Sequence, residues 1–201
     1  MVVEYKIHDH VKVAVYQQAK AGNYCCGDSY VMIETKQYFL CAIADGLGSG
    51  EGALISSDEV MKMIKEFHYE PLEVLMKRCN DALVGKRGAV LTVLKVDYEE
   101  NLLHYSNVGN IGFIYYLPNG EVIRPIPTRG FLSGRKNTIK VERYPYKSGS
   151  AFLLYSDGMK LSSSKQLNTT MLQSPDEAAE FIQENIKNKA DDLTVLIGKI
   201  R

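Results

Sequence analysis

Alternating apolar and polar positions dominate the chain and predict β-strands along most of its length. Two runs, 151–156 and 194–200, are almost continuously apolar, which is typical of strands covered on both faces. Short polar segments, including Asn119-Gly120, separate neighbouring runs and predict hairpin turns. The expected strands are 12–18, 30–33, 38–44, 89–97, 102–108, 111–117, 121–124, 151–156 and 194–200.

Helical periodicity replaces this alternation in three stretches. Apolar residues recur at helical spacing over 54–67 and again over 71–83. A third helix is predicted from Ser174, because Ser174-Pro175-Asp176-Glu177 is a capping box with proline at the first helical position. This order of elements lacks the regular alternation of a doubly wound fold. It predicts an α+β domain in which two antiparallel sheets pack face to face with helices outside.

Composition limits the classes of protein that the chain can represent. The 201 residues are 45% hydrophobic and contain no linker-like segment, so we expect one domain over 1–201. Lys+Arg and Asp+Glu each number 24, and this balance favours neither nucleic acid nor a disordered acidic tail. No apolar run is long enough for a transmembrane helix, and no signal core opens the chain. We therefore expect a cytoplasmic protein without a membrane partner, and the balanced charge favours a monomer.

The four cysteines give no sign of a metal or disulfide framework. Cys25 and Cys26 are adjacent, while Cys41 and Cys79 are isolated, so no Cys-x-x-Cys pair exists. The loop of a cysteine phosphatase, Cys-x5-Arg, is also missing. We interpret all four as reduced thiols, packed as small hydrophobic side chains.

Acidic residues recur where apolar strands begin or end. Asp45 and Asp157 each follow an apolar run and precede a glycine, Asp191-Asp192 precedes the last strand, and Asp28 precedes an early one. Each Asp-Gly pair taken alone is also what an ordinary turn contains. Carboxylates next to a core are costly unless a cation neutralises them, and no lysine or arginine lies within three positions of Asp28 or Asp45. Oxygen-only ligands favour Mg²⁺ or Mn²⁺.

Five motifs in a fixed order extend this argument to a family. "GDSY", "ADGLGSG", "SNVGN", "LLYSDGM" and "ADDLTVLI" span nearly the whole chain. Together they resemble the metal-dependent protein serine/threonine phosphatases of type 2C, and within them the bacterial SpoIIE-like branch. The resemblance implies a four-layer α-β-β-α sandwich and two Mn²⁺ or Mg²⁺ ions at one end of it.

The resemblance also implies a role for each acid. Asp45 matches the acid that bridges both ions, and Asp157 and Asp191 match the other carboxylates of the first ion. These three would be catalytic through metal-activated water, which attacks phosphorus directly. The full implied ligand set is Asp28, Asp45, Gly46 (through its carbonyl), Asp157 and Asp191, with Asp192 as a supporting neighbour.

Two positions depart from the larger members of the family. Gly27 stands where they carry a glutamate ligand, and Leu47 stands where they carry a histidine. The bacterial branch shares both departures, which predict a weaker second metal site. No arginine near Asp28 matches the phosphate-binding arginine of the larger enzymes. Arg87 and Arg129 are candidates for that task, but each is better explained as a solvated surface residue.

The expected partner follows from the resemblance alone. Short members of this branch, without sensor or transmembrane parts, reset the stressosome in the general stress (sigma-B) response. The implied substrate is therefore a phosphorylated stress-signalling protein, either a stressosome scaffold or an anti-sigma-factor antagonist. A catalytically inactive phosphoprotein-binding module is the alternative, although the acids it would be expected to lose are present. Asn107 and Asn110 match a turn near the metal end and are interpreted either as turn formers or as catalytic groups.

Overall fold

The computed structural model describes residues 2–159, 170–171, 173–185 and 190–201. Its strands form two sheets in which every pair of neighbours is antiparallel. The six-stranded sheet has the order β1 (Val2–Ile7), β2 (Val11–Gln18), β11 (Leu193–Ile200), β10 (Ala151–Tyr155), β7 (Gly112–Tyr116) and β8 (Val122–Ile123). The five-stranded sheet has the order β3 (Asp28–Glu34), β4 (Tyr38–Gly46), β5 (Ala89–Asp97), β6 (Leu102–Val108) and β9 (Val141–Pro145).

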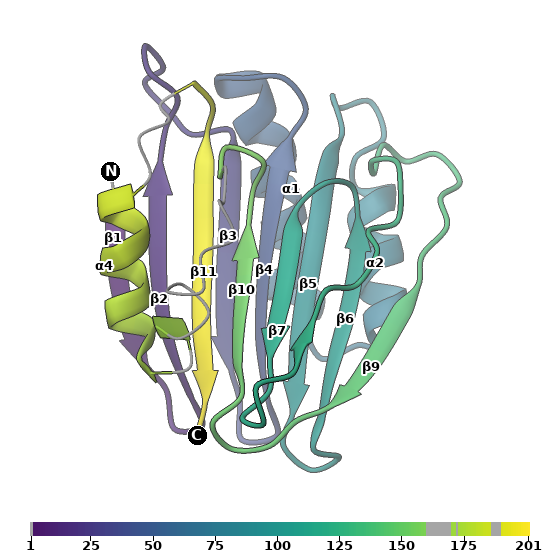
Figure 1. Ribbon diagram of the computed structural model, residues 1–201. Helices are drawn as coiled ribbons and strands as arrows, with labels where there is room; N and C mark the ends of the chain where they lie inside the picture. Colours follow the sequence, from purple (N-terminus) through teal and green to yellow (C-terminus); the bar gives the residue numbers. More distant parts are fainter. Residues whose placement is uncertain (1, 160–169, 172, 186–189) are drawn as a thin grey trace.

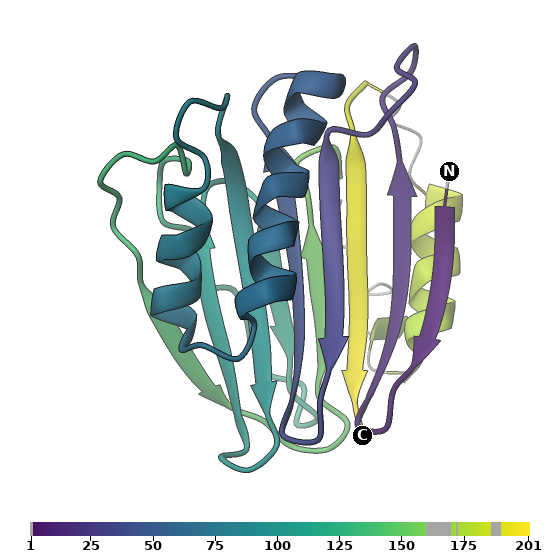
Figure 2. The same ribbon diagram turned by 180° about the vertical axis from the view of Figure 1, so that it is seen from behind.

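Helices cover the outer face of each sheet. The helices α1 (Glu51–Phe67) and α2 (Leu72–Asp81) lie on the five-stranded sheet, where α1 contacts β3 and β4 and α2 contacts β6 (Figure 2). On the other side, α4 (Pro175–Asn185) packs against β2 and β11 of the six-stranded sheet (Figure 1). This arrangement confirms the four-layer α-β-β-α sandwich.

Three buried clusters fill the spaces between the four layers. The central cluster joins the inner faces of the two sheets, for example through Phe39 and Phe152, whose ring centroids are 6.3 Å apart. Successive residues of β5 alternate: Leu94 belongs to the central cluster, whereas Val93 belongs to the cluster under α1 and α2. Because both faces of these strands are covered, their sequences are almost continuously apolar.

Sequence patterning missed β1 and β9, two of the four edge strands. Both lie at the outer edge of their sheets, where only one neighbouring strand pairs with them. The side chains of β9 are half-buried or exposed, and its sequence mixes charged and apolar residues. The pattern of a strand covered on one face only is weak. In the predicted Asn-Gly turn, Gly120 alone takes the positive φ, at 87°.

The chain directions bring the strand-end acids together. Strands β4 and β10 end, and strands β3 and β11 begin, at the same end of the sandwich, which is uppermost in Figure 1. The hairpin turns between β1 and β2, β3 and β4, and β5 and β6 lie at the opposite end. The antiparallel order of the two sheets therefore positions the site.

Candidate metal centre

Four strand-end aspartates face the same end of the sandwich. Asp28 opens β3 and lies directly opposite Asp45 of β4 in the antiparallel register. Asp157 follows β10 in the other sheet, and Asp191 lies just before β11. An open cleft of about 450 Å³ is lined by Asp45, Asp157 and Asp191. Carboxylates that are distant in the sequence and come from both sheets therefore surround one space.

The carboxyl group of Asp45 has no partner among its described neighbours. In the described part of the chain, no hydrogen bond or ion pair reaches its carboxylate. Burial raises the pKa of Asp45, and the nearby carboxylates of Asp28 and Asp157 raise it further. Both causes disfavour the ionised form, so a cation bound between these acids would relieve them together.

Asp28 is buried, with 2% of its surface exposed, yet only one of its carboxylate oxygens is occupied. The hydroxyl of Ser156 donates a hydrogen bond to Oδ2 over 2.7 Å, while Oδ1 is buried and has no hydrogen-bond partner among the described residues. Burial raises the pKa of Asp28, and the Ser156 hydroxyl opposes that rise. A buried carboxylate oxygen without a donor is costly, and a cation is the partner it lacks.

Asp157 and Asp191 are exposed toward the cleft. The side-chain amide of Asn110 donates to Asp157 Oδ2 over 2.9 Å and so fixes that carboxylate. Burial raises the pKa of Asp157, and the carboxylate of Asp191 adds to the rise. Asp191 accepts a hydrogen bond from the backbone N–H of Asp192 over 3.0 Å. The amide of Asn110 is therefore an orienting group within the site.

Asp192 differs from the other acids because both of its oxygens are satisfied. The backbone N–H groups of Lys20 and Gly27 donate to its carboxylate over 2.8 and 2.9 Å. These bonds fasten the segment before β3 to the segment before β11. Asp192 thus joins the two sheets beside Asp28.

Close backbone contacts explain the glycines at the site. A Cβ on Gly46 would lie 1.9 Å from the carbonyl oxygen of Ala53 in α1. A Cβ on Gly158 would lie 2.2 Å from the carbonyl oxygen of Asp192, and one on Gly27 would lie 2.9 Å from the Asp192 carboxylate. Gly27, the departure from the larger enzymes, therefore leaves the space that Asp192 occupies.

The donor set fits a hard divalent cation. Its groups are carboxylate and backbone carbonyl oxygens, which Mg²⁺ and Mn²⁺ prefer. A bound cation would stabilise the ionised carboxylates of Asp45 and Asp28, whose pKa values are raised, and would give Oδ1 of Asp28 the partner that it lacks. Asp28, Asp45, Gly46, Asp157 and Asp191 would hold the ions.

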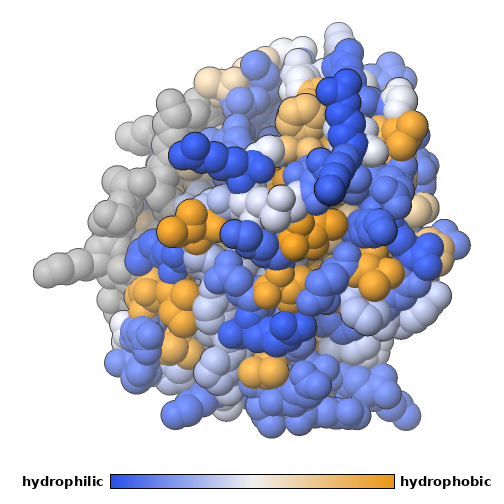
Figure 3. Space-filling model, turned by 90° about the vertical axis from the view of Figure 1, so that its right-hand side faces the viewer, coloured by the Kyte–Doolittle hydropathy of each residue, from blue (hydrophilic) through white to orange (hydrophobic). Residues whose placement is uncertain are grey.

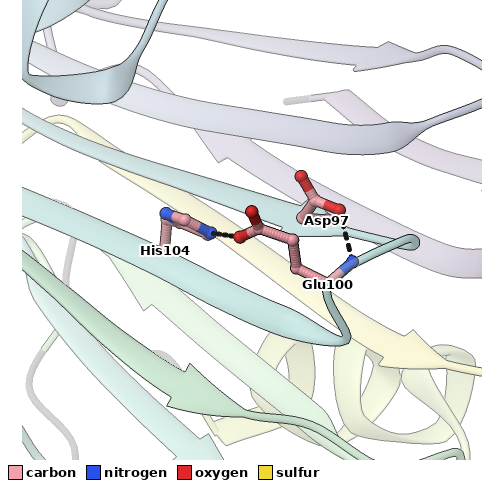
Figure 4. A group of neighbouring side chains, drawn as sticks. All are labelled: Asp97, Glu100 and His104. Atoms are coloured by element: carbon pink, nitrogen blue, oxygen red, sulfur yellow. Dashed lines mark hydrogen bonds and ion pairs between the residues drawn. The ribbon is translucent and has the colours of Figure 1, made fainter.

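Another group of possible ligands lies at the opposite end, around the turn between β5 and β6 (Figure 4). The ligand atoms of Asp97, Glu100 and His104 are all within 4.8 Å of one another. Local contacts account for this group: Asp97 Oδ1 accepts the N–H groups of Glu99 and Glu100 over 2.9 Å, and Glu100 pairs with His104 over 3.5 Å. We interpret it as a capped turn beside a Glu100–His104 contact.

Residues around the cleft resolve several open interpretations. Asn107 is buried and donates to the Thr92 hydroxyl over 2.7 Å, so it is a structural clamp and not a catalytic group. Arg87 lies against Gly52 in the first turn of α1 and does not line the cleft, whereas Arg129 does. Leu47, which stands where the larger enzymes carry a histidine, also lines the cleft. The role of Ser156 was missed, because a serine before Asp-Gly carries no signal by itself.

Known proteins resemble this chain over its whole length. A family model described as "Stage II sporulation protein E (SpoIIE)" matches residues 35–201. The phosphoserine phosphatase RsbX of Bacillus subtilis (strain 168) is 33% identical over 199 residues, which cover 99% of this chain and 100% of RsbX. A crystal structure of RsbX in complex with magnesium matches with a TM-score of 0.92 and 32% identity, covering 100% of both chains. A structure from work on the bacterial stressosome matches with a TM-score of 0.85 and 25% identity, covering 95% of this chain and 100% of the other.

Proposed function

The chain belongs to the SpoIIE family of type 2C, metal-dependent phosphatases, and we propose that it removes phosphate from phosphoserine or phosphothreonine of a stress-signalling protein. The observation that carries this proposal is the convergence of Asp28, Asp45, Asp157 and Asp191, none of which forms an ion pair with a described residue. Such a set needs cations, and cations at an open cleft suit an anionic substrate.

Each residue of the site has a defined task in this proposal. Asp45 and Asp157 would hold the ions in the cleft, with Asp157 oriented by Asn110. Asp28 would hold an ion through its free Oδ1 while Ser156 fixes its other oxygen. When bound, Mn²⁺ or Mg²⁺ lowers the pKa of a water that attacks phosphorus and neutralises charge on the phosphoryl oxygens. No side-chain nucleophile is required, and the four cysteines are free thiols outside the cleft.

A stressosome-type scaffold is the partner that we propose. The support is the 33% sequence identity to RsbX over the full length of RsbX, together with the match to a structure from work on the stressosome. An anti-sigma-factor antagonist is the other substrate considered, and nothing in the site favours it. No described helix is long and apolar enough to cross a membrane.

Three further features are part of the same proposal. The shared central core of the two sheets supports a single domain over 1–201. Four free thiols support a reducing, cytoplasmic location. A monomeric state stays a prediction that light scattering would test.

The experiment that tests the function is phosphate release from a phosphoserine-containing stressosome scaffold protein. We expect release with Mn²⁺, loss of release with excess chelator, and recovery when Mn²⁺ is added again. A phosphotyrosine peptide serves as the control for substrate class and should be dephosphorylated much more slowly. Tight binding of the phosphoprotein without any release in Mn²⁺ would instead identify an inactive binding module.

A further inference from the structure

One wall of the cleft comes from the segment 128–132, which belongs to no helix or sheet strand. Arg129, Gly130 and Phe131 of this segment line the cleft together with Asp45, Asp157 and Asp191. Arg129 is the one positively charged residue among the described residues that line it. Its guanidinium has no hydrogen bond or ion pair with any described residue. The wall of the cleft therefore includes an exposed arginine that has no partner among the described residues.

The segment is held firmly at both ends. The buried amide of Asn107 accepts the N–H of Thr128 over 3.2 Å, and the carbonyl of Thr128 accepts the N–H of Gly109 over 2.8 Å. At the other end, Ala89 and Leu132 exchange two backbone hydrogen bonds of 3.0 and 2.8 Å. Three residues, Arg129, Gly130 and Phe131, lie between these anchors. The place of Arg129 is consequently set by the fold and not by its own side-chain contacts.

An apolar surface adjoins Arg129. Phe131 is 45% exposed although it is large and hydrophobic, and the side chain of Leu47 lies near it, over the same side of Gly88. On the face of the molecule in Figure 3, hydrophobic side chains form small separate patches among hydrophilic ones, so exposed apolar surface is dispersed there. An exposed aromatic ring beside acids and a free arginine is the composition of a small recognition site.

We propose that the segment 128–132 recognises the substrate: Arg129 binds the phosphoryl oxygens, and Phe131 contacts an apolar residue next to the phosphoserine. This inference rests on the proposed phosphatase function and names the chemistry that the substrate offers. A guanidinium can donate hydrogen bonds to two phosphoryl oxygens at once. The occupant to which the proposal commits is a phosphoserine segment with an apolar neighbour, because its charge complements Arg129.

The test compares four variants on two kinds of substrate. The variants are Arg129→Ala, Arg129→Lys, Phe131→Ala and, as the matched control, Arg135→Ala, whose residue lies in the same loop but outside the cleft. The small substrate is para-nitrophenyl phosphate. The peptide substrates are two synthetic phosphoserine peptides that differ only by leucine or glycine beside the phosphoserine. The affinity for inorganic phosphate is measured by calorimetry in the presence of Mn²⁺.

Arg129→Ala is expected to raise KM for every substrate about tenfold or more and to weaken phosphate binding by the same factor. Arg129→Lys should recover part of this loss, and Arg135→Ala should stay within about twofold of the wild type. Phe131→Ala should leave KM for the small substrate unchanged and abolish the preference for the leucine peptide. The affinity for Mn²⁺ and the melting temperature should not change in any of the variants.

The outcomes separate this inference from the function on which it rests. Unchanged phosphate affinity in Arg129→Ala would overturn the role of Arg129, even in an enzyme that turns over normally. A leucine preference that survives in Phe131→Ala would overturn the role of Phe131. A wild type that releases no phosphate with Mn²⁺ would overturn the proposed function, and the calorimetric comparison would still decide whether Arg129 binds phosphate, because it needs no turnover.

Discussion

Strand β3 carries an acidic residue at each end, and the two have opposite surroundings. Asp28 at its start is buried among carboxylates, with one oxygen lacking a donor. Glu34 at its end accepts hydrogen bonds from the N–H groups of Asp9 and His10 over 3.1 and 3.2 Å, and from the Tyr98 hydroxyl over 2.8 Å. His8 Nδ1 lies 3.0 Å from the same carboxylate.

The paired carboxylate at one end of β3 stabilises the fold, whereas the unpaired carboxylates at the other end form the candidate metal centre. At the Glu34 end, one carboxylate ties the β1–β2 hairpin turn to β3 and β5, so its charge contributes to folding. At the Asp28 end, several carboxylates repel one another and contribute nothing until a cation arrives. Uncompensated like charges in an otherwise well-paired structure are expected at functional sites.

The largest effect is expected from Asp45→Asn. This change keeps the side-chain volume but removes the charge at the centre of the acid group, so the site should hold its metal ions poorly. We expect phosphate release with Mn²⁺ to fall by about a thousandfold or more. The measurement is the release of phosphate under saturating substrate over a range of Mn²⁺ concentrations.

The matched control for this change is Asp81→Asn, which replaces an exposed aspartate at the end of α2. Its activity should equal that of the wild type. Folding of Asp45→Asn should be intact, and its melting temperature without metal should not fall. Turnover near the wild-type rate in Asp45→Asn would refute the metal mechanism.

At the opposite end of β3, Glu34→Ala should lower the free energy of unfolding and leave the rate of phosphate release unchanged. Removing the carboxylate leaves three donors and His8 without their shared partner, which we expect to cost about 2 kcal/mol of the free energy of unfolding. Urea denaturation measures this loss. The control is Glu99→Ala, because Glu99 is exposed and its carboxylate has no partner among the described residues. A loss of kcat in folded Glu34→Ala would mean that the two ends are coupled.

The same contrast explains what the sequence could predict. The apolar runs of β4, β5, β10 and β11 predicted the sandwich, because strands covered on both faces leave a strong pattern. The edge strands β1 and β9 left only a weak pattern, and the sequence analysis did not predict them. Asp28, Asp45, Asp157 and Asp191 could be selected from their places at strand ends and from family motifs, since both are local in the sequence.

Contacts between distant segments could not be predicted in that way. The bond from Ser156 to Asp28 spans 128 positions, and those from Lys20 and Gly27 to Asp192 span 172 and 165. No local pattern records such pairs, because they depend on how the two sheets are stacked. For the same reason, the sequence offered Arg87 and Arg129 as equal candidates, and only the fold places Arg129 in the cleft.

The smallest effect that we predict is an unusual dependence of stability on pH in the metal-free protein. Burial and neighbouring carboxylates raise the pKa of Asp45 and Asp28 in the folded state, whereas the unfolded chain keeps ordinary values. The folded state therefore binds protons more tightly, so stability is greatest below about pH 4 as far as these two groups are concerned and falls as pH rises through their raised pKa values.

We expect this contribution to appear as a loss of the free energy of unfolding between pH 5 and pH 8, measured by urea denaturation with a chelator present. Asp45→Asn should reduce the slope because it removes one of the titrating groups, and saturating Mn²⁺ should reduce it because the cation takes the place of the protons. Glu34→Ala should lower the whole curve and leave its slope in this range nearly unchanged. The contrary result is a metal-free wild type whose stability changes between pH 5 and pH 8 by the same amount as that of Asp45→Asn. It would show that the strand-end acids do not repel one another, and the contrast between the two ends of β3 would then be one of position only.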